Sequence, residues 1–463
     1  MAFEQVGFSF RGDFPHADMV QRLVDIYGAK LGKNKLRNRY YEGKNTLKDF
    51  GIAIPPELKK VETVVGWPRV AVDALAVRSR FDGFTAGDEE TTALLNRIAE
   101  QSLLKQRYKQ TVQSELIYSC SFITLSRGDE DDDEPDVLFS VHSAENAVAE
   151  WDYRHNRIAD GLVFVDWDTD HNLIEANLYT SDAVWVLEKA PDGLWDWTKL
   201  PHSMGRPLME AFAYRSTESR PFGQSRINRA VRSITDSAVR EALRSEVSAE
   251  FFTTPQKYML GIDPADEDDG GKAKWEAYIG NFLFASRDED GNLPQIGQLS
   301  ASPMSPHTDY MRSLAGRFSG ETNVPVSQLG VLHDQAASAE AIYASCEGLV
   351  IEAEDLNESN RLALQNIARM AVAIVKNVSL KELTADERDI VANFKNPNMP
   401  SLASQADAMI KIASVVPEFA GTEVFYEQLG FSEDIIRRIM RETEAARRQM
   451  ALQQMLLGEN NGG

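Results

Sequence analysis

The clearest periodic pattern in the chain lies in its last third, where apolar residues recur at steps of three and four. The pattern runs without proline from Ser338 to Asn377 and includes Leu349, Leu356 and Ile367. Such spacing places the apolar side chains on one face of an α-helix. About 38 helical residues span roughly 57 Å. We therefore predict a long helix that has neighbours along its whole length or a kink, with Gly348 as the best kink site.

Other stretches show the same helical spacing over shorter distances. They begin at His16, at Trp67, at Glu89 (to about Ser114), at Ser225 (to about Phe252) and at Ser305 (to about Phe318). The chain becomes helical again after "NPNMPSLASQADA". Ser225 and Ser432 can each cap a helix, because a serine hydroxyl accepts a hydrogen bond from a free N–H of the first turn.

From Leu116 the period changes to two, which predicts β-strands. A first strand candidate, "LIYSCSFITLSRG", is followed by "VLFSVHS", "AVAEWDYR", "GLVFVDWDT", "LIEANLYT", "AVWVLEKA" and "LWDWTKL". Turn residues separate these runs, so we predict an antiparallel meander of about six strands. The tryptophans of this region are expected to pack between the sheet and helices, and a sugar-binding platform is the less favoured alternative. They are Trp151, Trp167, Trp185, Trp195 and Trp197.

Length and composition describe an ordinary globular chain. Its 463 residues exceed one compact core, so two to four structural units are expected. No window approaches 18 apolar residues and no signal sequence is recognised at the start, so we expect no membrane segment. Cys120 and Cys346 lie far apart in apolar or small-residue contexts. We expect two free thiols in a protein made in a reducing compartment.

The charge is strongly negative, with 71 acidic against 49 basic residues and a formal net charge of -22. This argues against a protein that grips a nucleic-acid backbone, but not against a surface that nucleic acid passes without binding. The acidic runs 129–134 and 266–269 are expected to be solvated loops rather than cation sites. A basic cluster at 30–39 is either a solvated helix face or a contact for an acidic neighbour.

Motifs of common enzymes are missing from the sequence. It contains no Walker A phosphate loop, no G-x-G-x-x-G and no H-E-x-x-H, and "GRFSG" has the wrong spacing for a nucleophile elbow. The seven histidines are scattered, with no pair at ligand spacing. These absences remove the phosphate-loop and common metal-hydrolase explanations but do not exclude an enzyme. We expect no catalytic residue, no metal site and no cofactor.

Five short sequence segments, in a fixed order along the chain, carry a resemblance to a known family. They are "YYEGKNTLKDFGIAIPP", "VVGWPRVAVDALAVRSRFDGF", "RPFGQSRI", "VPVSQLGV" and "SAEAI". With this order of elements, the chain resembles bacteriophage portal proteins, particularly those of long-tailed phages of actinobacteria, over at least residues 20–450. The resemblance implies an α+β portal fold with wing, stem, clip and crown, in which long helices and an antiparallel β-meander assemble as a ring.

The resemblance also implies a division of the chain. Residues 1–224 would form the wing, 225–252 the first stem helix, 253–304 the clip, 305–325 the second stem helix, 326–337 the tunnel loop, 338–377 the long wing helix, and 378–463 the crown and C-terminal tail. The clip would hold short strands, a short helix at Lys272–Ile279 and two acidic loops.

Site residues follow from the same resemblance. The tunnel loop would present Leu332, His333, Asp334, Gln335, Ala336 and Ala337 to the channel. The stem interface between subunits would use Arg226, Arg229, Arg232, Asp236, Arg240, Glu241 and Arg244. The clip would bind partners through Asp266, Glu267, Asp268, Asp269, Asp288 and Asp290.

A portal is a ring, usually of twelve subunits, through which DNA is packaged into the capsid and ejected into the tail. The implied partners are other copies of the chain, the major capsid protein, the terminase large subunit, a head-tail adaptor protein and the double-stranded DNA in the channel. The protein would be made in the host cytoplasm and reside in the virion. Two alternatives stay open from the residues: another virion structural or adaptor protein, and a soluble enzyme with a site in the Trp-rich β region.

Overall fold

The computed structural model describes residues 7–45, 63–129, 134–253, 257–260, 295–298, 303–331, 339–398, 402–431 and 433–459. The chain divides into two compact units, Met1–Pro397 and Asn398–Gly463. The predicted tunnel-loop residues, the six acidic clip residues and the predicted helix Lys272–Ile279 lie outside the described residues.

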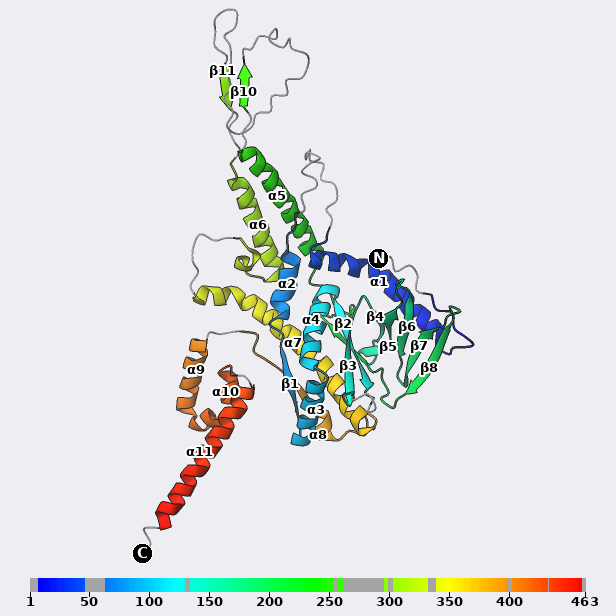
Figure 1. The fold of residues 1–463 in the computed structure, drawn as a ribbon, viewed down its shortest axis with the longest axis vertical. Helices are drawn as coiled ribbons and strands as arrows, with labels where there is room; N and C mark the ends of the chain where they lie inside the picture. Colours follow the sequence, from blue (N-terminus) through cyan, green and yellow to red (C-terminus); the bar gives the residue numbers. More distant parts are fainter. Residues whose placement is uncertain are drawn as a thin grey trace, which may run out of the picture. The chain divides into compact units, whose positions relative to one another are not determined.

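The first unit is built around the long helix α7 (Ala339–Lys376), which is drawn in yellow in Figure 1. Its ends lie within one residue of the predicted limits, and the helix continues through Gly348. Leu349, Leu356 and Ile367 are buried as the periodicity requires. Among the described elements, three helices (α2, α3 and α8) and four strands (β2, β3, β9 and β12) contact it along its length. The prediction of a long, supported helix is confirmed.

The described part of the first 118 residues contains four helices. They are α1 (Ala17–Glu42), α2 (Trp67–Ala76), α3 (Glu89–Gln101) and α4 (Leu104–Tyr118). The single helix predicted from Glu89 to Ser114 is wrong, because Leu103 adopts a left-handed backbone (φ 52°) that ends α3 and starts α4 in a new direction. The strand predicted from Leu116 is also shorter than expected. Helix α4 continues to Tyr118, and the strand begins after Ser119, which is left-handed too.

The predicted meander is divided between two sheets. Strands β4 (Ala147–Asp152), β5 (Arg157–Trp167), β6 (Leu173–Tyr179), β7 (Ala183–Lys189) and β8 (Trp195–Pro201) form a five-stranded antiparallel sheet in chain order. The first predicted strand of the six, β3 (Val137–Ser143), instead pairs with β2 (Cys120–Arg127). On its other edge, β2 pairs with β9 (Met209–Ala213), a strand that the sequence pattern did not predict.

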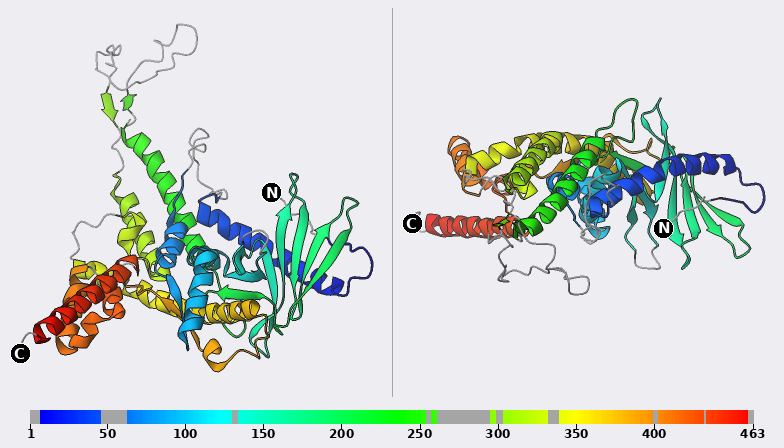
Figure 2. Two further views of the ribbon diagram at one scale, coloured as in Figure 1. Left: turned by 60° about the horizontal axis from the view of Figure 1, so that its bottom comes forward. Right: turned by 90° about the horizontal axis from the view of Figure 1, so that it is seen from above.

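Helix α1 lies across the five-stranded sheet (Figure 2) and closes a core of its own. Leu23 and Tyr27 of α1 pack in the same buried cluster as Trp185 and Trp195. The predicted core role is therefore confirmed for these two tryptophans, whereas Trp197 remains 38% exposed.

A two-stranded sheet joins distant parts of the first unit. Strand β1 (Phe81–Ala86) pairs antiparallel with β12 (Ile390–Phe394), just after the short helix α8 (Ala385–Arg388). Residues 378–397 therefore belong to the first unit, although they fall in the segment 378–463 that the resemblance assigns to the crown.

A helical hairpin extends from the first unit (Figure 1). It consists of α5 (Arg229–Thr253) and α6 (Ser305–Thr322), with β10 (Lys257–Leu260) and β11 (Gln295–Gln298) paired antiparallel beyond its tip. Asn228, rather than Ser225, caps α5 by accepting a hydrogen bond from the N–H of Val231 at 2.9 Å. A 3-10 turn, η4 (Val326–Leu329), follows α6.

The second unit is helical where it is described. It contains α9 (Leu402–Val415), the 3-10 turn η5 (Pro417–Gly421), α10 (Glu423–Gln428) and α11 (Glu433–Glu459). Throughout the described part of the chain, no helix combines the length and apolarity that a membrane span requires.

Candidate functional site: the junction of the stem and the long helix

Both ends of the α5–α6 hairpin meet at one buried arginine. Arg226 precedes α5 and is only 4% exposed. Its Nε donates to the carbonyl of Ala71 in α2 at 2.6 Å, and its Nη2 donates to the carbonyl of Thr322 at the end of α6 at 2.5 Å. One guanidinium thus fixes the entry and the exit of the hairpin to the body of the protein.

The counter-charge of Arg226 comes from the long helix. Glu352 of α7 is 6% exposed, and its Oε1 lies 2.5 Å from Nη1 of Arg226. The same carboxylate accepts hydrogen bonds from the hydroxyl of Tyr214 and from Nδ2 of Asn323, and it pairs with Arg215 at 2.9 Å. Burial alone would raise the pKa of Glu352, but Arg226 and Tyr214 outweigh it and hold this pKa below its usual value. Glu352 is therefore an ionised, buried carboxylate that fixes Arg226 to α7.

We call the set Tyr214, Arg215, Arg226, Thr322, Asn323 and Glu352 the stem junction. It connects α2, the strand end after β9, both ends of the hairpin and α7. A buried ion pair costs desolvation and is not itself strong evidence of stability, but such pairs can specify a unique arrangement. The arrangement specified here is the attachment of the hairpin to the long helix.

A second contact holds α5 against α1. The hydroxyl of Tyr40 donates to Asp236 at 2.8 Å, and the guanidinium of Arg232 lies 5.9 Å from the centre of the Tyr40 ring. The resemblance assigns both Asp236 and Arg232 to the interface between subunits. The structure brings them to contacts within the chain.

The two hairpin helices are joined by a histidine. His307 of α6 places Nδ1 2.6 Å from Oε1 of Glu241 and Nε2 2.9 Å from Oγ of Ser248, both on α5. The order Ser–His–Glu is that of a hydrolase triad. Ser248, however, lies inside α5, where the backbone N–H groups are bonded within the helix and cannot form an oxyanion hole. The cluster is therefore a clamp between helices.

The remaining predicted stem residues differ in exposure. Arg226 and Glu241 are buried by their own chain, at 4% exposure each, so we leave them out of the proposed interface. Arg229 and Arg244 are exposed, and Arg244 pairs with Glu241 at 3.3 Å. Arg240 donates to the hydroxyl of Ser237. The structure does not bring these seven side chains into one cluster.

A buried polar network also lines α7. Glu115 of α4 is fully buried and accepts from Asn360 of α7 at 2.9 Å, and Asn360 also donates to the hydroxyl of Tyr108. Burial raises the pKa of Glu115 to about 8. Glu352 and Asn360 were not singled out from the sequence, although both interrupt the apolar stripe of the long helix, which is the signal that could have identified them.

The first unit combines a body of helices and sheets, a protruding helical hairpin with a strand pair at its tip, and a long helix that returns through the body. This architecture agrees with the class of protein that the sequence motifs indicate, which is a structural subunit of the portal class. The chain belongs to the family "Phage portal protein, SPP1 Gp6-like", whose model matches residues 21–448.

Individual relatives agree with this assignment. The chain is 28% identical over 383 residues to the portal protein of Mycobacterium phage D29, covering 81% of this chain and 77% of the relative. It is 28% identical over 385 residues to the portal protein of Mycobacterium phage L5, with the same coverage. Similar solved structures include chains of a native gene transfer agent virion and of the neck of that particle. The virion chain has a TM-score of 0.43 at 14% identity, and the match covers 86% of this chain and 94% of that chain. The neck chain has a TM-score of 0.42 at 11% identity, and the match covers 81% of this chain and 89% of that chain.

The function predicted from the resemblance is therefore confirmed: the chain is a portal protein of a tailed phage. As such it is a virion component, and its family is a structural one. The mixed helix and antiparallel-sheet fold class is confirmed as well.

Proposed function

We propose that twelve copies of this chain form a ring, with the α5–α6 hairpins side by side around a channel for double-stranded DNA. The observation that supports this is the stem junction. It fixes both ends of a protruding hairpin to α7 through Arg226 and Glu352. A hairpin held at both ends keeps its direction when many copies pack laterally, which a loosely attached hairpin does not.

Neighbouring stems meet, in this proposal, through the charged faces of α5. Arg229 and Arg244 are exposed, and Arg232, Asp236 and Arg240 lie along the same helix. The channel itself transports a polyanion, so it must not bind DNA tightly. A net charge of -22 supports a channel in which repulsion keeps the DNA centred.

The residues proposed to face the DNA are Leu332–Ala337, the tunnel loop. The chain before them is anchored, because Nε1 of Trp67 donates to the carbonyl of Leu329 at 3.1 Å. The chain after them enters α7, which the stem junction holds. We propose that these two anchors let the short loop respond to DNA while the body stays fixed.

The tip of the hairpin is the proposed docking point for partners. The clip residues Asp266, Glu267, Asp268, Asp269, Asp288 and Asp290 would contact the terminase large subunit during packaging and the head-tail adaptor later. The major capsid protein is a further proposed partner. We propose no catalytic residue and no cofactor for this chain, and synthesis in the host cytoplasm before assembly into the virion.

Imaging and native mass measurement of the purified full-length chain test the ring. We expect a closed ring with a central hole and a mass of twelve chains, and a monomer or an open sheet would contradict the proposal. A variant that lacks Leu332–Ala337 tests the loop. It should assemble the same ring but package or retain less DNA, and normal packaging and retention would contradict the role of the loop.

A further inference from the structure

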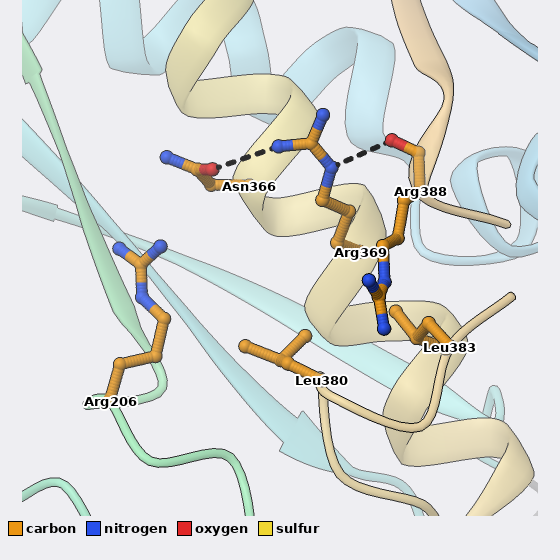
Figure 3. Close-up of a pocket in the computed structure, with 6 residues that line it drawn as sticks. All are labelled: Arg206, Asn366, Arg369, Leu380, Leu383 and Arg388. Atoms are coloured by element: carbon orange, nitrogen blue, oxygen red, sulfur yellow. Dashed lines mark hydrogen bonds between the residues drawn. The ribbon is translucent and has the colours of Figure 1, made fainter. Parts of the chain in front are cut away.

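A pocket of about 320 Å³ lies beside the C-terminal half of α7, further along the helix than Glu352. Figure 3 shows it between three chain segments. Asn366 and Arg369 belong to α7, Leu380, Leu383 and Arg388 follow that helix, and Arg206 lies before β9. None of these residues contributes to the stem junction.

Three guanidinium groups line this pocket. Arg206 is 8% exposed and pairs with Glu210, yet its buried Nε has no hydrogen-bond partner. Glu210 divides its carboxylate between Arg206 and Asn366, whose Nδ2 donates to Oε1 at 3.2 Å. A buried donor without a partner costs free energy unless a water molecule or a ligand supplies an acceptor.

The other two arginines are held by neutral acceptors. Nε of Arg369 donates to the carbonyl of Arg388 at 3.0 Å, and Arg388 in turn donates to the carbonyl of Lys381 at 2.5 Å. Burial, and then the charge of Arg206, lower the pKa of Arg369, while Asp389 opposes this. Glu210 pairs with Arg206, and Asp389 acts on Arg369, so these two acidic groups lie near three guanidinium groups.

The shape of the pocket defines the ligand further. Leu380 and Leu383 give it an apolar wall, with guanidinium groups on both sides (Figure 3). Its volume corresponds to roughly ten water molecules. That space suits a side chain with an aliphatic stem and a carboxylate head, because guanidinium groups bind carboxylates in a bidentate manner.

We propose that this pocket binds a glutamate or aspartate side chain from an acidic peptide segment of a partner protein. A DNA duplex is a poorer fit, because its phosphates approach exposed basic surfaces and this chain carries a net charge of -22. The inference goes beyond the portal function and holds for any copy number of the ring.

The test measures binding of a fluorescein-labelled hexaglutamate peptide to the full-length protein by fluorescence anisotropy. Arg369→Gln with Arg388→Gln keeps a polar side chain at both positions, shorter than arginine, but removes both charges. We expect the Kd of this variant to rise at least about tenfold, which corresponds to about 1.4 kcal/mol, because the charge-assisted hydrogen bonds from both guanidinium groups to the peptide carboxylate are lost. Arg80→Gln with Arg97→Gln, two exposed arginines of the same unit, is the matched control and should bind as the wild type does.

A second variant, Leu380→Glu, places a carboxylate in the pocket and should compete with the peptide, so that binding is lost while the thermal unfolding midpoint is kept. A 20-base-pair duplex serves as the other probe. Equal peptide affinity in the wild type and the Arg369/Arg388 variant would overturn the proposal. It would also be overturned if the pocket variants lost duplex binding but not peptide binding. Neither result bears on whether the chain forms a ring.

Discussion

At the scale of single residues, buried charges determine how the hairpin is attached. Glu352 is 7% exposed in its side chain and satisfies Arg226, whereas Arg215, its other basic partner, is 57% exposed. The two ion pairs share one carboxylate but differ in environment. Removal of Glu352 leaves the charge of Arg226 uncompensated inside the protein, whereas removal of the exposed Arg215 leaves Glu352 paired with Arg226.

Glu352→Ala should therefore lower the free energy of unfolding by about 3–5 kcal/mol, the usual cost of breaking a buried pair. Arg215→Ala should cost below about 1 kcal/mol, because exposed pairs are screened by solvent. Chemical denaturation of both variants and of Glu354→Ala, an exposed glutamate on the same helix, makes the comparison. Equal losses for Arg215→Ala and Glu352→Ala would contradict the assignment of Arg226 as the principal partner.

Glu115 makes the stability depend on pH. Its pKa rises from 4.5 to about 8 because it is buried. Between these values the folded protein keeps a proton that the unfolded chain releases, so stability falls by about 1.4 kcal/mol per pH unit as pH rises. The contribution is complete below pH 4.5 and is lost as pH rises through 8.

Glu115→Gln should remove this component of the slope, so that the variant gains stability over the wild type as the pH rises from 5 to 8.5. Urea denaturation across this range measures it, with the exposed Glu358→Gln as the control. Parallel pH profiles for the wild type and Glu115→Gln would show that Glu115 is ionised in the fold.

The sequence pattern predicts the buried apolar residues better than it predicts the polar contacts. The three- and four-residue spacing identified Leu349, Leu356 and Ile367 as buried. The resemblance assigns Arg226 to a subunit interface, and its place among mixed charges on a predicted helix agrees with an exposed position. Its burial depends on Ala71 and Glu352, which are 155 and 126 residues away in the sequence, so local patterns do not reveal it.

At the scale of elements, pattern and structure agree where a segment determines its own conformation. The limits of α7 follow from its long apolar stripe, along which no proline occurs. The division of the strands into two sheets does not follow from the sequence pattern, because the pattern of one strand does not show which other strand it pairs with. Pairing of β1 with β12 joins segments about three hundred residues apart. The break at Leu103 requires a left-handed leucine, which propensity disfavours.

The contact between α5 and α6 can be tested at His307. His307→Leu removes both hydrogen bonds to α5, one to Glu241 and one to Ser248. A lost hydrogen bond of ~1 kcal/mol corresponds to roughly fivefold faster opening. Hydrogen exchange should therefore accelerate in the first turns of α6, and Tyr310→Ala, an exposed position on the same helix, should leave it unchanged. Unchanged exchange in His307→Leu would mean that apolar packing alone holds the hairpin.

At the scale of the whole molecule, the α5–α6 hairpin protrudes from the body of the first unit (Figure 1). Its charged face carries the exposed residues Arg229 and Arg244, and its base is fixed by the stem junction. The rigid attachment and the exposed charge have different roles in our proposal. The first sets the direction of each stem, and the second contacts the neighbouring stem.

Charge reversal on the stem separates these roles. Arg229→Glu with Arg244→Glu should reduce the fraction of twelve-chain rings, because complementary contacts between neighbouring stems become repulsive. The effect of these substitutions on the ring fraction should be smaller at high salt, because exposed charges are screened there. The unfolding midpoint of dissociated chains should stay close to that of the wild type, since both residues are exposed. Native mass measurement at low and high salt gives the ring fraction, and Arg80→Glu with Arg97→Glu is the control with equal charge change away from α5. If both double variants reduced the ring fraction equally, net charge rather than the stem surface would govern assembly.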